Sequence, residues 1–390
     1  MSAHQPISTA VVGIGLRQYK RAAAPLPEQG VLVETIVDAC ADAGLDPAEI
    51  DGFVSYGGDS NDPTRLMHDL GTRQLSWSAQ VWGGGGGGIA GTFGQAAAAI
   101  ATGQARTVVI FRAMVQGDSG RMSGAVMAHH LNDHLMGAGL VAPALECAMR
   151  AQRMMEHHGV TERTVEEFVR ASYYHGARNP RAVTYGKDLD VAGYRASRMI
   201  SEPFHLFDCS RENDGAGALI LVAADRARNL KAPPVYLRAS AQGAARGWGD
   251  LAQNDRDYAS AGFGGAGGVA ERLWAMAGIG PADVQVAQIY ENFSAQGIAA
   301  LIDHGFCTYE TVADFVRFEN LIAPSGRLPI NTSGGNLAQG FIHGIGMAIE
   351  AVEQLRGTSA NPVPGAVNCL LTGGPGAPLV SSAIFTNQAN

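Results

Sequence analysis

Residues 43–50 read AGLDPAEI and residues 277–284 read AGIGPADV, so one eight-residue pattern returns 234 positions later. Four of the eight positions are identical, and the others include Leu/Ile, Glu/Asp and Ile/Val pairs. In each copy Gly is typical of a helix end, and Pro of the start of a second short turn. A helical pattern precedes each copy and an apolar strand pattern follows it, over 31–43 and 52–56 in the first half and over 269–277 and 286–290 in the second. This duplication predicts two halves built on one plan.

The two halves continue in parallel beyond the repeat. In each, a glycine cluster opens a helix of small residues and an apolar strand pattern follows: Gly83–Gly88, 89–102 and 107–111 in the first half, and Gly334–Gly335, a helix ending at Arg356, and 366–371 in the second. Apolar strands that alternate with helices predict an α/β fold, with parallel or mixed sheets covered by helices.

We expect two domains, residues 1–230 and 231–390, which meet near the segment LKAPP at 230–234. The first domain carries an insertion at about 115–200 that is rich in His, Met and Arg. Its pattern is mostly helical, and we expect it to form a loop domain over the active site.

Composition and charge exclude several classes of protein. Of 390 residues, 16% are charged and 46% hydrophobic, which excludes disorder, coiled coil and collagen and indicates a large dry core. The net charge of −8, without a basic stripe, argues against nucleic-acid binding. Residues 74–105 are uncharged but contain no continuous apolar run of about 18 residues, so no membrane span is expected. We see no secretory signal pattern, and five scattered cysteines without CxxC favour a reduced, cytoplasmic protein.

Five further stretches are FDCSRENDGAGALIL at 207–221, YENFSAQ at 290–296, HGFC at 304–307, NTSGGNLAQGFIHGIG at 331–346 and LLTGGPG at 370–376. In this order they resemble the thiolase superfamily, and its sterol-carrier/lipid-transfer branch in particular. The resemblance covers nearly the whole chain. It implies a thiolase fold, in which two similar α/β halves form a five-layer αβαβα sandwich.

The chain departs from this family at the positions that carry its chemistry. The nucleophilic Cys of thiolases falls on Gly86, the catalytic His on Phe341, the second Cys on Leu370, and the branch's second-half His on Tyr290. Covalent acyl transfer requires an activated nucleophile, and these positions do not supply one. Cys369 neighbours a vacated position, but adjacent strand residues point to opposite faces, so we expect it in the core.

One known branch of the superfamily combines these losses, namely the thiolase-like retro-aldolases of bacterial steroid side-chain degradation. The resemblance implies cleavage of a bulky β-hydroxyacyl-CoA into a ketone and a shorter acyl-CoA such as propanoyl-CoA. It also implies a homodimer core within a heterotetramer, completed by an OB-fold acyl-CoA-associated subunit. No cofactor is expected, because coenzyme A belongs to the substrate. That branch often has a second Tyr where this chain has Phe341.

Retro-aldol cleavage needs a base for the β-hydroxyl, donors for the thioester oxygen and an acid for the enolate. We expect Tyr290, at the end of a strand, to remove the hydroxyl proton or to return a proton to the enolate, and the basic role would need neighbours that lower its pKa from about 10. His343 is the candidate that replaces the missing Tyr, as an acid/base or as a thioester contact. The remaining expected contributors are Glu291 and Asn292, which orient the site, and Gly86, Phe341, Thr372, Gly373, Gly334 and Gly335, which shape the oxyanion and substrate-binding site.

Metal and imine routes are the less favoured alternatives. The three lysines lie in polar or loop-like segments, and the spacing of His129, His130 and His134 is a weak metal signal. A structural role is expected for His304 and Cys307, and a solvated helix end for His157 and His158. Two other functions stay open: a thiolase whose nucleophile is elsewhere in the chain, and a non-catalytic lipid or acyl-CoA-binding subunit.

Overall fold

The computed structural model describes residues 8–119, 137–140, 142–245, 248 and 260–389. Nine strands form one mixed sheet in the order β3-β2-β4-β7-β1-β8-β11-β10-β9. Their bounds are β1 Thr9–Lys20, β2 Gly52–Tyr56, β3 Trp77–Val81, β4 Thr107–Val115, β7 Asn213–Ala223, β8 Val235–Gly243, β9 Val286–Gln288, β10 Asn368–Gly373 and β11 Val380–Thr386. A separate two-stranded ribbon pairs β5 (Met199–Ser201) with β6 (Phe204–His205).

The sheet consists of two blocks, one from each half of the chain. Strands β3, β2, β4, β7 and β1 form the first block, and β8, β11, β10 and β9 form the second. The blocks join where β1 pairs with β8 over two residue pairs, Ala10 with Tyr236 and Val11 with Val235. This narrow junction lets the two blocks stack as separate layers of the fold.

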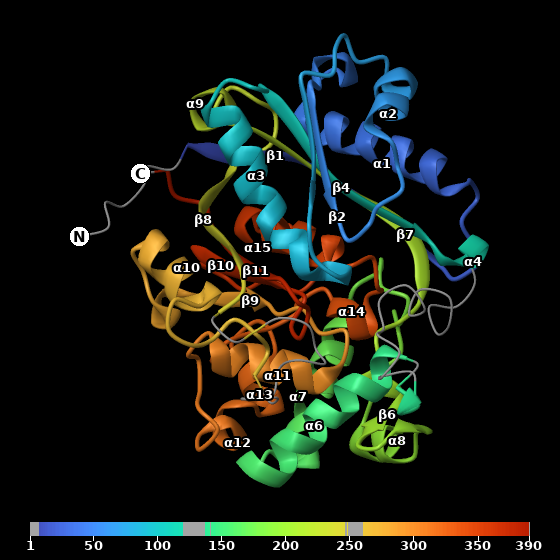
Figure 1. The fold of residues 1–390 in the computed structure, drawn as a ribbon, viewed down its shortest axis with the longest axis vertical. Coiled ribbons are helices and arrows are strands. Elements are labelled where there is room, and N and C mark those ends of the chain that lie inside the picture. The colour runs from blue at the N-terminus through green and yellow to red at the C-terminus, as the bar shows by residue number, and fades with distance from the viewer. Residues whose placement is uncertain (1–7, 120–136, 141, 246–247, 249–259, 390) are drawn as a thin grey trace.

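Helices cover both faces of each block (Figure 1). The longer ones are α1 Glu28–Ala43, α2 Pro63–Leu70, α3 Ile89–Ala101, α6 Pro143–His158, α7 Glu162–Arg178, α10 Val269–Ala277, α11 Ser294–Asp303 and α15 Ile345–Arg356. The short ones are α4 Gln116–Ser119, α8 Val191–Arg195, α9 Ala224–Ala227, α12 Val312–Phe315, α13 Phe318–Leu321 and α14 Gly335–Ala338. None of the described helices is both long enough and apolar enough to cross a bilayer.

Three hydrophobic cores correspond to the three helix layers of the expected sandwich. One joins α1 to the outer face of the first block, and a second joins α10 and α11 to the outer face of the second block. The third lies between the blocks, around α3 and α15, which contact strands of both. Cys369 and Leu371 face this middle core while Leu370 faces the outer one, so the alternation expected for Cys369 is confirmed.

The insertion contains the expected helices, but its core belongs to the second half. Buried residues of α6 and α7 share one hydrophobic cluster with α10 and α11, and both helices contact α11. Figure 1 shows α6 and α7 beside the orange helices of the C-terminal half. The packing unit therefore combines residues that lie on both sides of position 230.

Two predicted elements end earlier than expected, and both breaks build the site. The helix predicted from Gly334 to Arg356 is interrupted between α14 and α15, where Gly340, His343 and Gly344 have positive φ angles. The strand predicted to reach Tyr290 ends at Gln288, because side chains replace its sheet partners beyond that point. Asn331 Oδ1 accepts from the N–H of Ile289, and Thr372 Oγ1 accepts from the N–H of Tyr290.

Candidate active site

The site forms where the glycine run that opens α3 meets the segment after β9. The run Gly85–Gly88 is a 3-10 turn that leads directly into α3. A Cβ atom built on Gly86 would lie 2.1 Å from Cε2 of Tyr290 and 2.7 Å from its hydroxyl oxygen. A side chain at position 86 and the present ring position of Tyr290 therefore exclude one another. The phenol fills the volume in which a nucleophilic side chain at position 86 would begin.

Tyr290 is held on several sides. Thr372 Oγ1 accepts its backbone N–H at 2.9 Å, and the Phe341 ring packs edge-on with centroids 6.4 Å apart. Gly344 lies against the ring, since a Cβ there would be 2.7 Å from Cδ2. Burial, and then the nearby Glu291 carboxyl, raise the pKa of Tyr290 well above its ordinary value of 10. The pKa is thus raised, not lowered as a basic role requires, and the side chain is a neutral phenol at neutral pH.

The backbone of Gly86 faces the phenol oxygen. The Gly86 backbone partly offsets the rise in the pKa of Tyr290. Opposite it, Gly373 comes so close that a Cβ there would lie 2.8 Å from the Gly86 carbonyl oxygen. The glycines expected from the sequence therefore permit close backbone contact.

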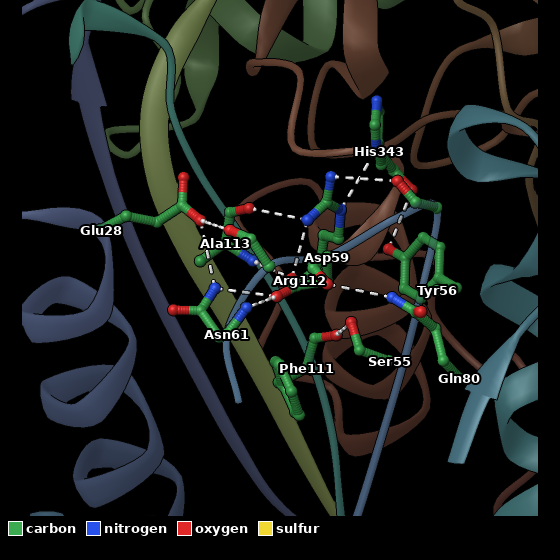
Figure 2. Close-up of polar contacts among 12 residues, drawn as sticks. Glu28, Ser55, Tyr56, Asp59, Asn61, Gln80, Phe111, Arg112, Ala113 and His343 are labelled. Atoms are coloured by element: carbon green, nitrogen blue, oxygen red, sulfur yellow. Dashed lines mark hydrogen bonds and ion pairs between the residues drawn. The ribbon is translucent and has the colours of Figure 1, made fainter. Parts of the chain in front are cut away.

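His343 lies in the break between α14 and α15, with a left-handed φ of 47°. The hydroxyl of Tyr56 donates to its carbonyl oxygen at 2.9 Å, and the Phe341 ring lies 5.1 Å from the imidazole. Arg112 Nε donates to Nδ1 at 3.1 Å (Figure 2). Burial and the Arg112 charge lower the pKa of His343 well below 6.5, so the ring is neutral. Phe341 contacts both Tyr290 and His343, which places all three in one site.

Arg112 and Asp59 form a buried ion pair behind His343. Arg112 Nη1 lies 2.7 Å from Asp59 Oδ2, and their side chains are 8% and 1% exposed. The same Asp59 oxygen accepts the backbone N–H of Ala113 at 3.2 Å. The sequence reading missed both residues. The signal was present, because Arg112 is the one charge within the apolar stretch 107–115.

Glu291 is fully buried beside Tyr290. Its Oε1 accepts the N–H of Leu337 at 3.4 Å, while Oε2 has no partner among the described residues. Burial raises the pKa of Glu291 to about 8. Gly335 leaves room for this carboxyl, because a Cβ there would lie 1.9 Å from Oε1.

The other expected residues lie at the edge of this arrangement. Asn292 is half-buried, and its side chain accepts the N–H of Phe293 while its carbonyl accepts that of Ser210. Gly334 packs on α7, since a Cβ there would lie 2.8 Å from Cα of Gly176. Neither Asn292 nor Gly334 forms a described hydrogen bond with the Tyr290 phenol or the His343 ring.

The remaining sequence expectations have mixed outcomes. His304 is structural, because Ala300 O and Ser382 Oγ bond its two ring nitrogens. Cys307 is buried, and His157 and His158 end α6. His129, His130 and His134 lie outside the described residues. Within the described ranges, no group of three or more His, Cys, Asp or Glu side chains could hold a metal.

Two clefts of about 430 and 390 Å³ lie along β1 rather than at the phenol. Both are lined by Leu16 and Arg181, and neither is lined by Tyr290 or His343. These two clefts and the residues expected to carry the chemistry are therefore in different places.

Comparisons with known proteins agree with this arrangement. A family model described as thiolase C-terminal domain-like matches residues 250–386. The 17-hydroxy-3-oxo-4-pregnene-20-carboxyl-CoA lyase of Mycobacterium tuberculosis is 37% identical, covering 95% of this chain and 97% of the relative. A steroid side-chain-cleaving aldolase of Thermomonospora curvata is 35% identical, covering 96% of each. A solved structure described as Ltp2-ChsH2(DUF35) aldolase has a TM-score of 0.90 at 33% identity, covering 98% of this chain and 99% of its own.

More distant matches share the fold. Human mitochondrial 3-ketoacyl-CoA thiolase superposes with a TM-score of 0.70 at 12% identity, covering 97% of this chain and 98% of its own. The five-layer thiolase architecture expected from the sequence is thereby confirmed.

Proposed function

The chain belongs to the thiolase superfamily, in the group of steroid side-chain-cleaving aldolases, and we propose that it is a retro-aldolase acting on a bulky β-hydroxyacyl-CoA. The products are a ketone and a shorter acyl-CoA, of which propanoyl-CoA is the example we favour. The observation that carries this assignment is the Tyr290 ring in the space of a side chain at Gly86. Acyl transfer needs a nucleophile, and this site presents a phenol instead.

The reaction moves one proton and breaks one carbon–carbon bond. The β-hydroxyl loses its proton, the oxygen forms the ketone carbonyl, and the electron pair of the Cα–Cβ bond passes into the thioester enolate. Protonation at Cα accompanies the loss of the β-hydroxyl proton and releases the shorter acyl-CoA. The high pKa of Tyr290 suits this last step, because a neutral phenol holds the proton to be delivered.

Tyr290 also takes part in the first proton transfer. Its oxygen accepts the β-hydroxyl proton as its own proton passes to Cα, so the phenol ends the cycle in its starting form. The Gly86 backbone stabilises negative charge on this oxygen during the exchange. Phe341 and Thr372 hold the ring and its backbone in place. No metal or organic cofactor enters this scheme, and coenzyme A is part of the substrate.

We further propose that the chain works as a homodimer core with an OB-fold acyl-CoA-associated subunit. The support is the likeness to the Ltp2-ChsH2(DUF35) aldolase over nearly the full length of both chains. Co-expression with such a subunit, followed by size-exclusion chromatography and light scattering, tests this proposal. A chain that cleaves substrate at full rate alone contradicts it.

Tyr290→Phe in the assembled complex tests the function. It removes only the oxygen, and we expect kcat to fall at least about a hundredfold, within the range for general acid–base groups. Affinity for acyl-CoA should change little, because the loss acts on the transition state. Tyr185→Phe is the matched control, because Tyr185 is 56% exposed. If the kcat of the Tyr290→Phe complex stays within about threefold of wild type, Tyr290 has a packing role and not a catalytic one.

Experiments on the same assembled complex distinguish the retro-aldolase from two other functions. A stable acyl adduct on a cysteine would indicate a thiolase, for which the buried Cys369 gives little support. Binding of acyl-CoA without turnover in any assembly would indicate a non-catalytic subunit.

A further inference from the structure

We propose that Arg112 is a positioning residue that fixes His343 as a neutral hydrogen-bond donor, whose Nε2–H binds the thioester oxygen of the substrate. This inference rests on the proposed function and assigns a side-chain donor to the thioester oxygen. It concerns the hydrogen-bond polarity of His343, which the sequence reading left open between acid/base and thioester contact.

The contact between Arg112 and His343 determines which ring nitrogen carries the proton. A guanidinium can only donate hydrogen bonds. Arg112 Nε therefore requires Nδ1 of His343 to be the acceptor, and the single proton of the neutral ring sits on Nε2. Protonating Nδ1 would set two N–H groups and two positive charges against one another. His343 is therefore unsuited to act as a base through either nitrogen.

Arg112 is itself held in one orientation. Asp59 pairs with Nη1, and the carbonyl of Ala113 accepts a second bond from Nη1 at 3.0 Å. Gly57 O accepts from Nη2 at 3.4 Å. With Nη1 and Nη2 bonded in this way, Nε is the donor left for His343.

The free nitrogen of His343 points toward the glycine run. No described residue accepts a hydrogen bond from Nε2, and Figure 2 shows this atom on the side of the ring away from Arg112. A Cβ built on Gly85 would lie 4.0 Å from Nε2, whereas one on Gly86 would lie 2.7 Å from the Tyr290 oxygen. The phenol and the imidazole donor thus flank two adjacent residues.

This placement fits the substrate. The Cα atom that receives the proton must approach the Tyr290 oxygen, and the thioester carbonyl is bonded to that Cα. A donor beside the phenol is therefore within reach of the carbonyl oxygen, where negative charge develops in the enolate. A neutral imidazole is a known electrophile for such oxygens, because it donates without having to lose its own proton to the substrate.

The charged and titratable groups around His343 come from three elements. Arg112 lies on β4, Tyr56 and Asp59 lie at and after the end of β2, and Tyr290 follows β9, with Phe341 between it and the imidazole. Glu291 lies behind Tyr290. The Gly57 and Gly85 backbones beside the ring carry no charge.

A spectroscopic test reads the tautomer without any turnover. In the assembled complex labelled with ¹⁵N-histidine, two-bond ¹H–¹⁵N spectra should show His343 protonated at Nε2 and not titrating between about pH 5.5 and 8.5. Arg112→Gln combined with Asp59→Asn removes both charges together and so leaves no unpaired buried ion. In this variant we expect the pKa of His343 to rise but to stay below its ordinary value, because burial, the largest cause of the shift, remains; the neutral ring, no longer facing the Arg112 donor, should also populate the tautomer protonated at Nδ1. A wild-type His343 that is protonated at Nδ1, or that titrates in this range, overturns the proposal.

The same spectra test the thioester contact. Adding propanoyl-CoA should shift the Nε2–H resonance, whereas coenzyme A alone should leave it in place. Equal responses to both ligands overturn the thioester assignment. Because no cleavage is needed, these results stand apart from a failure of the lyase reaction itself.

Kinetics of three His343 variants complete the test. His343→Gln carries its amide N–H₂ toward the Nε2 position, while His343→Asn carries it only as far as Nδ1. We expect His343→Ala and His343→Asn to lose about 10²–10³ in kcat, the usual cost of one oxyanion donor. His343→Gln should recover at least tenfold of that loss. Asn tolerates the left-handed backbone of this position, so the lower kcat of His343→Asn does not reflect backbone strain. Equal rates for the Gln and Asn variants overturn the proposal.

Discussion

Gly86→Ala is expected to displace the Tyr290 ring and disable the site. The added Cβ would lie 2.1 Å from Cε2, whereas ordinary contacts begin near 3.4 Å, so the ring must move by about 1.3 Å. It has little room, because Gly344 backs one side and Thr372 fixes the backbone. Overpacking of this kind costs about 1–3 kcal/mol of stability, and a misplacement of about 1 Å can cost a hundredfold in rate.

A double-mutant cycle isolates this contact. Removing the ring with Tyr290→Ala leaves space for the new methyl group, so Gly86→Ala should then be neutral or stabilising by up to about 1 kcal/mol. The coupling between the two positions should therefore be about 2 kcal/mol, measured by thermal denaturation of the four complexes. Gly84→Ala is the matched control, because its Cβ would meet only Pro378 Cδ, at 3.8 Å. Equal costs of Gly86→Ala with and without the ring would refute the reasoning.

Three further outcomes follow from the site and its surroundings. Iodoacetamide should leave cleavage largely intact, since burial raises the pKa of all five thiols, and intact-mass spectra should show no acyl adduct after substrate is added. Glu291 keeps its proton in the folded chain up to about pH 8 but ionises near 4.5 when unfolded, so its contribution to stability is complete below pH 4.5 and is lost as the pH rises to 8. Thermal midpoints of Glu291→Gln should accordingly fall less than those of wild type across this window, and parallel curves would contradict the assignment. Thr372→Val leaves the buried N–H of Tyr290 without its acceptor, so we expect a loss of about 1–3 kcal/mol in denaturation together with a lower kcat.

The architecture was predictable because the sequence repeats its own plan. The strand 52–56 and the helix 269–277 have the bounds that apolar periodicity predicted. The early end of β9 was missed because its cause is distant in sequence. The N–H groups of Ile289 and Tyr290 donate to Asn331 and Thr372, and no periodicity near Tyr290 reports these acceptors.

Some residues of the candidate site were predictable from the sequence and others were not. Tyr290 and Gly86 could be paired through the family positions, and the structure brings them into contact. Arg112 is marked in the sequence only as the one charge in an apolar stretch, and its contacts with Asp59 and with His343, which is more than 200 positions away, have no spacing signature. The direction of the pKa shift at Tyr290 was also beyond sequence reasoning, since burial, the largest cause, is set by the whole fold.

The position of β1 affects how the chain can fold during its synthesis. Residues 9–20 occupy the middle of the nine-stranded sheet, but their partners in β7 and β8 are made roughly 190 residues or more later. At about 5–20 residues per second, a ribosome needs roughly 10–40 s to cover that distance. During this interval the apolar strand has neither neighbour, and an unpaired strand edge is a site of aggregation. Yield in a heterologous host should therefore depend on translation speed and on chaperones that bind the nascent chain before β7 emerges.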